Sequence, residues 1–340
     1  MIECRAREGQ AHSARASAPR GGGRASLQFL HARRIAVDAN RPLASAASCA
    51  RGARRVSEAT VADWFFTSDL HGQGALYEQL LGMAAARRPR AVLIGGDLSP
   101  HDVSANGVAS QRVFLAGFFT EFARRLREAV PGCELLVLMG NDDWAANVDL
   151  LEEGDGDLWR FLHGRRVEVD GVHVAGLSWV PITPFTLKDW ERWDDGAEPA
   201  PRARLSGVTS RGGAIARCDF DPARREPTIG EALDELARAA VEPARTIFVC
   251  HTPPWGTRCD MIGAEAHVGS RALRSFVERH APPLVLSGHI HESARVSAAW
   301  RDAIGPTVVV NPGQFGGSRL CGVWFDPSDP AATLRHTVHG

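Results

Sequence analysis

Residues 63–72 have the sequence Asp-Trp-Phe-Phe-Thr-Ser-Asp-Leu-His-Gly, an apolar run followed at once by polar residues and glycine. The run up to Thr67 is short and aromatic, which predicts a buried strand. Asp69 and His71 come directly after it, so both side chains are expected in the loop at the carboxyl end of that strand. Carboxylate and imidazole groups are common metal ligands. This stretch therefore predicts a strand that delivers two metal-binding side chains.

The same arrangement recurs four times along the chain. Apolar strands are predicted at 91–94, 135–138, 246–250 and 284–286. Each is followed by a polar segment, and these segments are Gly95-Gly96-Asp97, Gly140-Asn141-Asp142-Asp143, Cys250-His251-Thr252-Pro253-Pro254 and Gly288-His289-Ile290-His291-Glu292. Polar loop residues placed at random would not recur at the same end of successive strands. Ligands of open α/β sheets gather outside the carboxyl ends of the strands, so we expect these side chains to meet at one site.

Helices are predicted between the strands, at 75–87, 111–129, 229–240 and 270–280. In the second of them Phe114, Phe118 and Phe122 recur at i, i+4 spacing and are expected to face the core. Further strands are predicted at 172–177, 308–310 and 322–325. The alternation of strands and helices indicates an α/β fold, with a sheet that carries helices on both faces.

The chain has 340 residues, of which 44% are hydrophobic and 23% charged, as in ordinary proteins with a large core. The net charge of −1 hides an asymmetry: residues 1–57 hold 11 Arg against Glu3, Glu8 and Asp38, a local charge of +8. The remainder holds 28 basic and 37 acidic residues, a charge of −9. Because binding of long nucleic acid needs a basic face, an acidic body argues against that class of partner.

Composition also divides the chain into regions. Residues 1–57 are rich in Arg, Ala, Ser and Gly without sustained periodicity, which predicts a disordered extension or sequence upstream of the true start; an organellar transit peptide is the alternative. Residues 58–340 are expected to form one domain. Within it, residues 180–228 contain six prolines, which predicts an excursion from the core and not a separate domain.

Several protein classes are disfavoured. The seven cysteines are widely spaced and form no CxxC pair, which argues against a disulfide framework and a structural zinc site. No apolar run approaches the roughly 18 residues of a membrane span, and the N-terminus lacks the apolar core of a secretory signal. We therefore expect a cytoplasmic protein without a membrane partner.

The five polar segments resemble the motifs of the calcineurin-like metallophosphoesterase superfamily, in the same order. The matching elements are DxH at Asp69 to His71, GD at Gly96-Asp97, GN at Gly140-Asn141, a lone His251, and GHxH at Gly288 to His291. The likeness spans about residues 64 to 325. Within the superfamily, the motifs look most like those of the small bacterial and archaeal branch that includes the MPPED-type phosphodiesterases. The resemblance implies a four-layer α/β/β/α sandwich.

The resemblance also implies a ligand set for two divalent cations: one on Asp69, His71 and His291, the other on Asn141, His251 and His289, with Asp97 bridging them. A mixture of oxygen and imidazole donors suits Mn, Fe, Zn or Ni better than Ca, which prefers oxygen alone. In this family a hydroxide that bridges both metals would be the nucleophile, its pKa lowered by the two cations. The implied activity is hydrolysis of a phosphate ester.

One position departs from the family pattern. The usual third motif continues as GNH followed by Asp or Glu, and its His binds phosphate and protonates the leaving group. Here Asp142 stands at the His position and Asp143 fits the acidic position, and both are candidate catalytic residues, as are Asp97 and Asn141. A phosphomonoester arrives as a near-dianion, so a carboxylate in place of a cationic imidazole penalises it more than a singly charged diester. We therefore favour a phosphodiesterase; a phosphomonoesterase and a non-enzymatic scaffold of the same fold are the alternatives.

The remaining site candidates are Asp142, Trp144, Trp255 and His267. Asp142 is a solvated acid, a general acid or an outer partner of a metal ligand. Trp144 and Trp255 adjoin metal motifs and either stack on a planar substrate group or pack in the pocket wall. His267 is a candidate substitute proton donor. The expected partner is a small phosphate ester, whose identity the sequence leaves open together with the metal and the oligomeric state.

Overall fold

The computed structural model describes residues 63–340, except 196–198, 200–201, 224, 226, 240–241, 264–265 and 315–317. The predicted N-terminal extension, residues 1–57, lies outside the described residues. None of the helices in the described part of the chain is both long and apolar enough to cross a membrane.

Two six-stranded mixed sheets form the centre of the fold. The first has the order β18 (Arg335–His336), β17 (Gly322–Phe325), β1 (Trp64–Thr67), β2 (Ala91–Ile94), β3 (Glu134–Val137) and β4 (Arg160–Phe161). The second has the order β15 (Arg301–Ile304), β16 (Thr307–Val310), β14 (Leu284–Leu286), β11 (Thr246–Cys250), β6 (Val172–Leu177) and β5 (Arg165–Val169). Strands β1 to β4 run parallel, as do β16, β14, β11 and β6.

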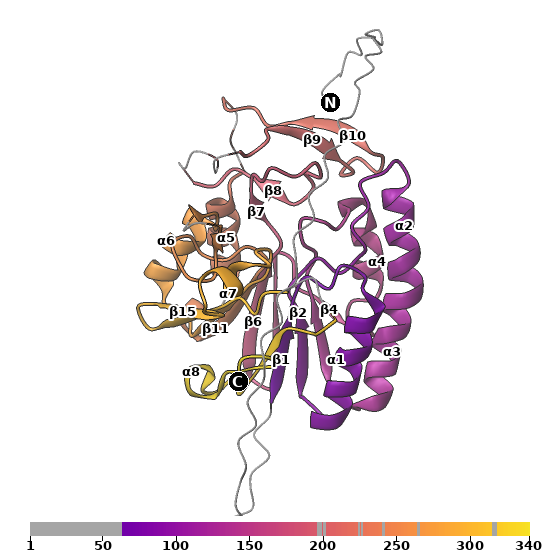
Figure 1. Ribbon diagram of the computed structural model, residues 1–340, viewed down its shortest axis with the longest axis vertical. Coiled ribbons are helices and arrows are strands. Elements are labelled where there is room, and N and C mark those ends of the chain that lie inside the picture. The colour runs from indigo at the N-terminus through magenta and orange to yellow at the C-terminus, as the bar shows by residue number, and fades with distance from the viewer. Residues whose placement is uncertain are drawn as a thin grey trace, which may run out of the picture. The chain divides into compact units, whose positions relative to one another are not determined.

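Helices cover the outer face of each sheet (Figure 1). Those on the first sheet are α1 (Gly74–Arg87), α2 (Gly107–Phe114), the π-helix η1 (Leu115–Phe119), α3 (Thr120–Ala129), η2 (Ala145–Asn147) and α4 (Val148–Glu153). Those on the second are α5 (Ile229–Ala239) and α6 (Arg271–His280), and the short helices η3 (Pro243–Arg245), α7 (Ser293–Val296) and α8 (Pro330–Thr333) lie in connections. The predicted four-layer α/β/β/α sandwich is confirmed.

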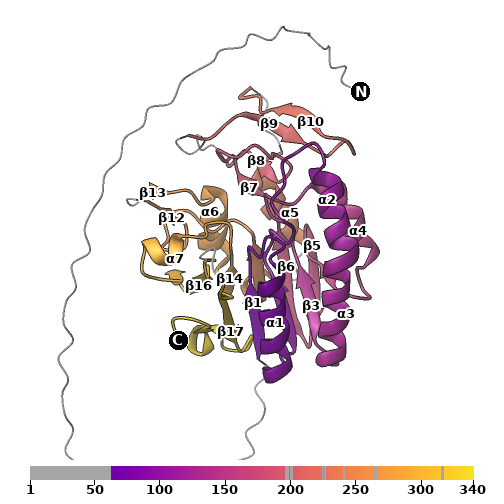
Figure 2. The same ribbon diagram turned by 45° about the vertical axis from the view of Figure 1, so that its right-hand side comes forward.

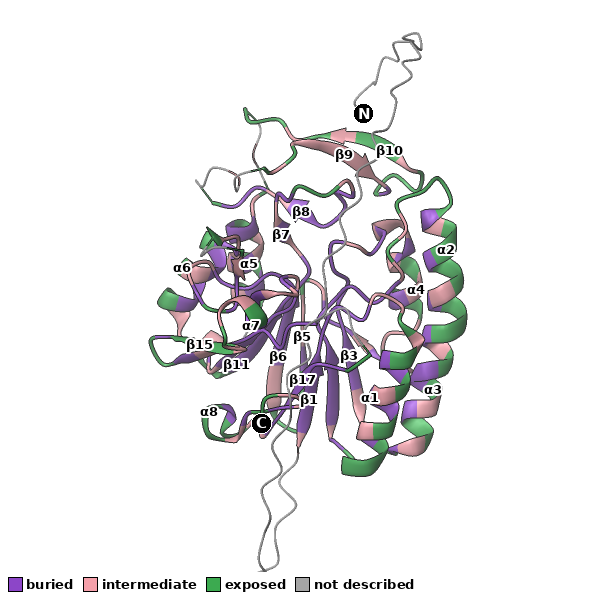
Figure 3. Ribbon diagram, in the orientation of Figure 1, coloured by how far each residue is buried: buried purple, intermediate pink, exposed green. Residues whose placement is uncertain are grey.

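The alternation of side chains along each strand explains the layers. In β1, Phe65 packs under the helices of the first sheet, whereas Trp64 and Phe66 enter the core between the two sheets. In β11, Val249 enters the same central core and Phe248 packs under α5 and α6. Successive side chains point to opposite faces, so a strand covered on both faces must be apolar throughout. Figure 3 shows the central strands buried accordingly.

The expectation of one sheet with helices on both faces is wrong in one respect, because the strands divide between two sheets. The apolar runs were predicted correctly, since both faces of each strand are buried. The run alone does not distinguish a face covered by a helix from a face covered by another sheet. In this fold helices cover one face of each sheet and the other sheet covers the opposite face, and the central core lies between the two sheets.

The predicted helix 111–129 begins earlier, at Gly107, and contains the π-helical turn η1. A π-turn holds more residues than an α-turn and therefore rotates the following residues relative to the preceding ones. As a result Phe118 is 36% exposed, while its neighbour Phe119 is fully buried. The expected core position of Phe118 is wrong for this reason, and that of Phe122 agrees with its burial.

The Pro-rich stretch near 180–228 leaves the second sheet after β6 and forms two small sheets of its own. Its strands are β7 (Val180–Pro181), β8 (Glu191–Arg192), β9 (Ser206–Thr209) and β10 (Ala216–Asp219), visible beyond the carboxyl edge of the main sheets in Figure 2. A further short pair, β12 (Met261–Ile262) and β13 (Ala266–His267), follows β11. Trp190 and Trp193 in the stretch are buried.

Candidate metal centre

All seven candidate ligands lie in loops at the carboxyl ends of parallel strands. Asp69 and His71 follow β1, Asp97 follows β2, and Asn141 follows β3 in the first sheet. The other three, His251, His289 and His291, follow β11 and β14 of the second sheet. The carboxyl edges of the two sheets face one another here, so side chains up to 220 residues apart in sequence come into contact.

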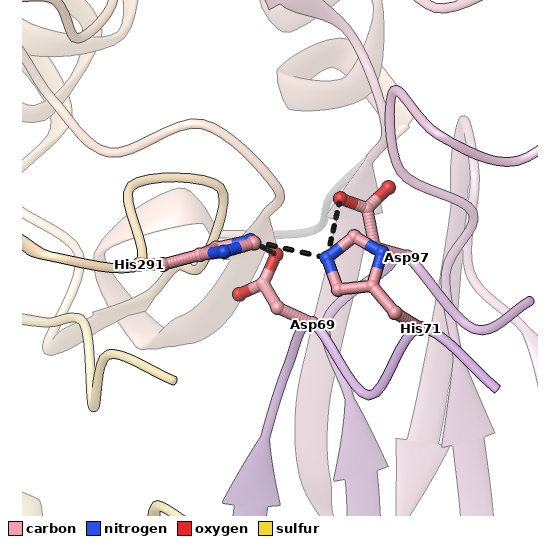
Figure 4. Close-up of side chains that lie close together, drawn as sticks. All are labelled: Asp69, His71, Asp97 and His291. Carbon is pink, nitrogen blue, oxygen red and sulfur yellow. Dashed lines mark hydrogen bonds and ion pairs between the residues drawn. The ribbon is translucent and has the colours of Figure 1, made fainter. Parts of the chain in front are cut away.

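A first cluster consists of Asp69, His71, Asp97 and His291, whose candidate ligand atoms all lie within 4.8 Å of one another (Figure 4). The Nε2 atoms of His71 and His291 face each other at 3.1 Å. His291 Nε2 lies 3.4 Å from Asp69 Oδ1. Two carboxylates and two imidazoles that converge on one point form a donor set suited to a divalent transition metal.

A second cluster lies beside the first and is built around the side-chain oxygen of Asn141. His251 Nε2 lies 3.1 Å from Asn141 Oδ1, and His289 Nδ1 lies 2.5 Å from the same atom. Asn141 is 4% exposed and His251 is fully buried. One amide oxygen and two imidazole nitrogens thus converge in a site with little access to water.

Asp97 lies between the two clusters. Its Oδ2 atom is 3.7 Å from His71 Nε2 in the first cluster and 3.5 Å from His251 Nε2 in the second. Its Oδ1 atom accepts a hydrogen bond from the backbone N–H of Asp142 at 2.8 Å, which fixes the carboxylate in this orientation. One carboxylate oxygen of Asp97 therefore lies within 3.7 Å of an imidazole from each cluster.

The protonation pattern of the histidines also fits a metal site. His251 Nδ1 lies 2.8 Å from the carbonyl oxygen of Gly95, which can only accept, so this nitrogen carries the hydrogen. In the neutral imidazole the lone pair is then on Nε2, which faces the cluster. His71 Nδ1 is buried without a hydrogen-bond partner in the described part of the chain. The Nε2 lone pair of His251 is therefore directed into the second cluster, as a metal ligand requires.

The cluster electrostatically favours positive charge. Burial lowers the pKa of His291, but the charge of Asp69 and its hydrogen bond outweigh burial and raise that pKa to about 9. Burial likewise opposes the charged form of His251, and Asp97 raises its pKa to about 9. For Asp97 burial raises the pKa, yet the charges of His251 and His71 hold it well below its usual range. A centre that draws protons onto its imidazoles is also one that attracts a cation.

The backbone at the site is strained. Asp69, His71, Asp97 and His289 have φ values of 61°, 44°, 51° and 66°. This left-handed region is uncommon for non-glycine residues, and such conformations cluster at functional sites held by the surrounding structure. Space is equally constrained: a Cβ atom on Gly140 would collide with Asp97 Oδ1, and one on Gly288 with Asp69 Oδ2. These glycines are required for the close approach of backbone and carboxylates.

The two acids after Asn141 have different surroundings. Asp142 is partly exposed, and its Oδ2 atom lies 3.6 Å from His71 Nδ1, beside the first cluster. Asp143 is fully buried, and its carboxylate accepts hydrogen bonds from the backbone N–H groups of Leu98, Ser99 and Gly140. Burial raises the pKa of Asp143 to about 6. A group enclosed in this way cannot reach a substrate, so its predicted catalytic role is corrected. Asp143 instead joins the loop after β2 to the loop after β3 by hydrogen bonds.

The aromatic and histidine candidates also differ from one another. Trp144 is fully buried and donates from Nε1 to the carbonyl oxygen of Asp102, so it has no face for a substrate; its proposed stacking role is corrected to wall packing. Trp255 is half-buried, with the guanidinium of Arg271 3.7 Å from its ring centroid. His267 binds Asp260 at 2.7 Å and, among the described residues, makes no hydrogen bond or ion pair with the seven candidate ligands. Substrate contact by Trp255 and proton donation by His267 remain predictions.

Sequence reasoning missed the residues that hold the Asn141 loop. The buried side chain of Gln111 donates to the carbonyl oxygens of Pro100 and Asp142, and it accepts from the N–H of Trp144. From the Pro-rich stretch, Trp190 Nε1 donates to the carbonyl oxygen of Asp143, and Asp189 accepts from the N–H of Ala145. The polar character of Gln111 inside an amphipathic helix was the one available signal.

The fold and the clustered Asp, His and Asn side chains define a class of protein, the metal-dependent hydrolases of phosphate esters. Comparison with protein families agrees: residues 65–293 match the calcineurin-like phosphoesterase model. The chain belongs to this family. Among curated protein sequences none matches.

Solved structures of similar fold exist. One crystal structure has a TM-score of 0.56 at 14% sequence identity and covers 81% of this chain and 98% of its own. The structure of TT1561 from Thermus thermophilus has a TM-score of 0.49 at 19% identity, with the same two coverages of 81% and 98%. An archaeal phosphodiesterase has a TM-score of 0.38 at 10% identity, again covering 81% and 98%. At 14% identity the likeness to the first structure concerns the fold alone.

Proposed function

We propose that this chain hydrolyses small phosphodiesters at a centre of two divalent cations. The observation that carries the proposal is the position of Asp97, whose Oδ2 atom lies within 3.7 Å of imidazoles from both clusters. One cation would be held by Asp69, His71 and His291, the other by Asn141, His251 and His289, with Asp97 shared. The donor set favours Mn, Fe, Zn or Ni.

Paired cations of this kind acidify water and neutralise the charge that develops on phosphoryl oxygens. The protein's part is to hold the ligands in place and to exclude bulk water from them. Asp69 and Asp97 are each 1% exposed, so their charges act in a medium of low polarity, where electrostatic attraction is stronger than in water. The strained loop backbone keeps both carboxylates aimed at the cluster.

The preference for diesters rests on Asp142. The carboxylate of Asp142 lies 3.6 Å from the ring of His71. The usual family motif carries a histidine at the position of Asp142. A carboxylate in place of an imidazole at this distance from the first cluster favours a diester monoanion over a phosphomonoester dianion. The charge of −9 on residues 58–340 favours a small substrate over long nucleic acid, which binds to basic surfaces.

The test is a comparison of kcat/KM for bis-p-nitrophenyl phosphate and p-nitrophenyl phosphate, with Mn, Ni, Zn and Mg supplied in turn. We expect metal-dependent turnover and a higher kcat/KM for the diester. Asp142→His should shift the ratio towards the monoester by about tenfold, because it replaces a negative group with a potential cation.

Asp142→Asn is the matched variant that removes the charge and adds no imidazole. It should shift the ratio in the same direction by less. A wild type that prefers the monoester, or a histidine variant that moves further towards the diester, contradicts the electrostatic argument. A wild type without activity on any ester and with any of the four metals contradicts the proposed function itself.

A further inference from the structure

His101 lies beside the candidate metal centre in the loop that follows β2. Its Nδ1 atom is 2.8 Å from Asp142 Oδ2, and its side chain is 54% exposed. The same Asp142 oxygen lies 3.6 Å from Nδ1 of His71 in the first cluster. One carboxylate therefore separates His101 from a candidate metal ligand, and His101 stands between the cluster and solvent.

The loop that carries His101 is fixed on both sides of it. The N–H groups of Leu98 and Ser99 donate to Asp143, and the carbonyl oxygen of Asp102 accepts from Trp144 Nε1. Every one of these contacts joins the His101 loop to the loop of Asn141. The backbone on both sides of the exposed His101 is therefore hydrogen-bonded to a loop of the candidate metal centre.

Gln111 strengthens the same connection. Its buried side-chain amide donates to the carbonyl oxygens of Pro100 and Asp142, at 2.9 and 2.7 Å. These are the residue before His101 and the residue that His101 contacts. The buried side chain of Gln111 therefore fixes the backbone next to His101 and at Asp142, so that the imidazole and the carboxylate lie opposite each other.

The charge state of His101 follows from its neighbours. The hydrogen bond to Asp142 raises the pKa of His101 above its usual value and outweighs partial burial, which lowers it; the charges of Asp142, Asp97 and Asp102 act in the same direction as the hydrogen bond. With Nδ1 directed at Asp142, Nε2 is the nitrogen left for other contacts. An imidazolium next to a phosphoryl-transfer site is a suitable proton donor.

We propose that His101 is a catalytic residue that donates the proton from Nε2 to the leaving oxygen, with Asp142 as its positioning residue. This assignment rests on the proposed function. As the water oxygen forms the new P–O bond, the bond to the leaving group breaks and leaves its electron pair on the leaving oxygen. That oxygen takes the proton from His101, and the proton lost by the water passes to solvent, from which the imidazole is reprotonated.

The assignment agrees with the preference for diesters. The positive charge of a protonated His101 lies beside the carboxylate of Asp142, at 2.8 Å, whereas the usual family motif carries an imidazole at the position of Asp142. The pair thus supplies a proton without adding the net positive charge that favours a dianion. It also accounts for an aspartate where the family has a histidine: Asp142 holds the histidine supplied by another loop.

The test compares two substrates that differ in their need for a proton donor, methyl phenyl phosphate and methyl p-nitrophenyl phosphate, with saturating Mn. His101→Asn keeps a donor for Asp142 and removes the ionisable Nε2. We expect kcat/KM to fall about 100-fold for the phenyl ester and less than about tenfold for the nitrophenyl ester, because nitrophenolate leaves without a proton. His173→Asn, which alters a histidine beside Glu168 far along the second sheet, is the control and should match the wild type.

Metal content and melting temperature complete the test. Both should equal those of the wild type in His101→Asn, because the side chain is exposed and is not placed among the ligands. Equal losses on both esters, no loss on either, or loss of bound metal each overturns the role of His101 while leaving the proposed function in place. A wild type inactive on both esters and on the nitrophenyl substrates above overturns the proposed function, and the role of His101 with it.

Discussion

Asp97 has the most demanding position of any residue in the centre. It is 1% exposed, its φ is 51°, and one oxygen faces imidazoles of both clusters. Burying an ionised carboxylate costs several kcal/mol unless opposite charge compensates it. The surrounding imidazoles provide that compensation in part, and bound cations would provide more. A change of this one side chain therefore affects both clusters together.

We expect Asp97→Asn to reduce bound metal at both sites and to lower kcat/KM by more than about 100-fold, beyond the effect typical of residues that only support a ligand. The amide has nearly the same shape, so the fold should persist. Metal analysis of the purified protein and circular dichroism measure the two quantities. Asp102→Asn, in the same loop but with its side chain turned to Ser104, is the matched control. Two metals per chain with near-normal turnover in Asp97→Asn would show that this carboxylate is not shared.

At the level of elements, the π-helix η1 decides which aromatic residues of its helix reach the core. Phe119 is fully buried and contacts the rings of Tyr77 and Trp159, with centroid separations of 6.0 and 5.2 Å. Phe118 stacks on Phe114 nearer the surface, at a centroid separation of 5.2 Å. Regular α-helical spacing predicts the opposite order of burial.

Two alanine substitutions test this register. Phe119→Ala should lower the free energy of unfolding by about 3–5 kcal/mol, the cost of removing a large core aromatic. Phe118→Ala should cost about 1 kcal/mol or less, because its ring is 36% exposed. Urea denaturation of both variants and the wild type gives the comparison. A greater loss from Phe118→Ala would mean that the helix is α-helical throughout.

A second element-scale feature is the buried ion pair in the Pro-rich stretch. Lys188 Nζ lies 2.7 Å from Glu191 Oε2, and neither side chain is exposed. Thr183 donates to the same carboxylate and accepts from Lys188 at its carbonyl oxygen. Asp189, next to Lys188, bonds to the N–H of Ala145 beside the metal loop. The pair thus supports a segment that braces the centre.

We expect Lys188→Met to destabilise the protein by about 3–5 kcal/mol, because Glu191 loses its buried partner and must either stay charged inside the protein or take up a proton. The double change Lys188→Met with Glu191→Leu should recover most of that loss. Thermal unfolding of the wild type and of both variants provides the measurement. An additive, larger loss in the double variant would indicate that packing volume matters more than charge here.

The pH dependence offers a separate check on the pair. Burial raises the pKa of Glu191 from 4.5 to about 7 despite the attraction of Lys188. Between these values the folded chain holds a proton that the unfolded chain has released, so stability should fall as pH rises through this window. The double variant lacks the group and should lack its part of the decline.

Across the whole molecule, the sequence predicted what depends on local pattern. Strands buried on both faces are continuous apolar runs, which can be recognised in the sequence. The candidate metal-ligating side chain that follows each of these runs can be recognised in the same way. The sequence did not predict what depends on contacts between distant segments. Gln111 meets Asp142 across 31 residues, and His101 becomes significant only when its loop lies against that of Asn141. The division of strands into two sheets and the π-turn likewise depend on packing and not on periodicity.

The extent of the folded unit leads to a prediction about the N-terminal segment. The three cores of the described residues are built from Trp64 onwards, and the family match begins at residue 65. Deletion of residues 1–57 should therefore change neither the melting temperature nor kcat/KM. Calorimetry and the diester assay measure both. A shift of the melting temperature by several degrees would show that the segment contributes to the fold.

The position of the candidate centre between the two sheets has a further consequence. Each cluster combines residues that follow strands of the first sheet with residues that follow strands of the second. A bound cation would therefore link the two sheets at the carboxyl ends of their strands. A cation at about 100 times its dissociation constant adds roughly 2.7 kcal/mol to stability. Addition of a chelator should therefore lower the melting temperature of the wild type but not that of Asp97→Asn. A cell short of the metal would then lose the protein itself as well as its activity, since chains that open more often are removed by proteases.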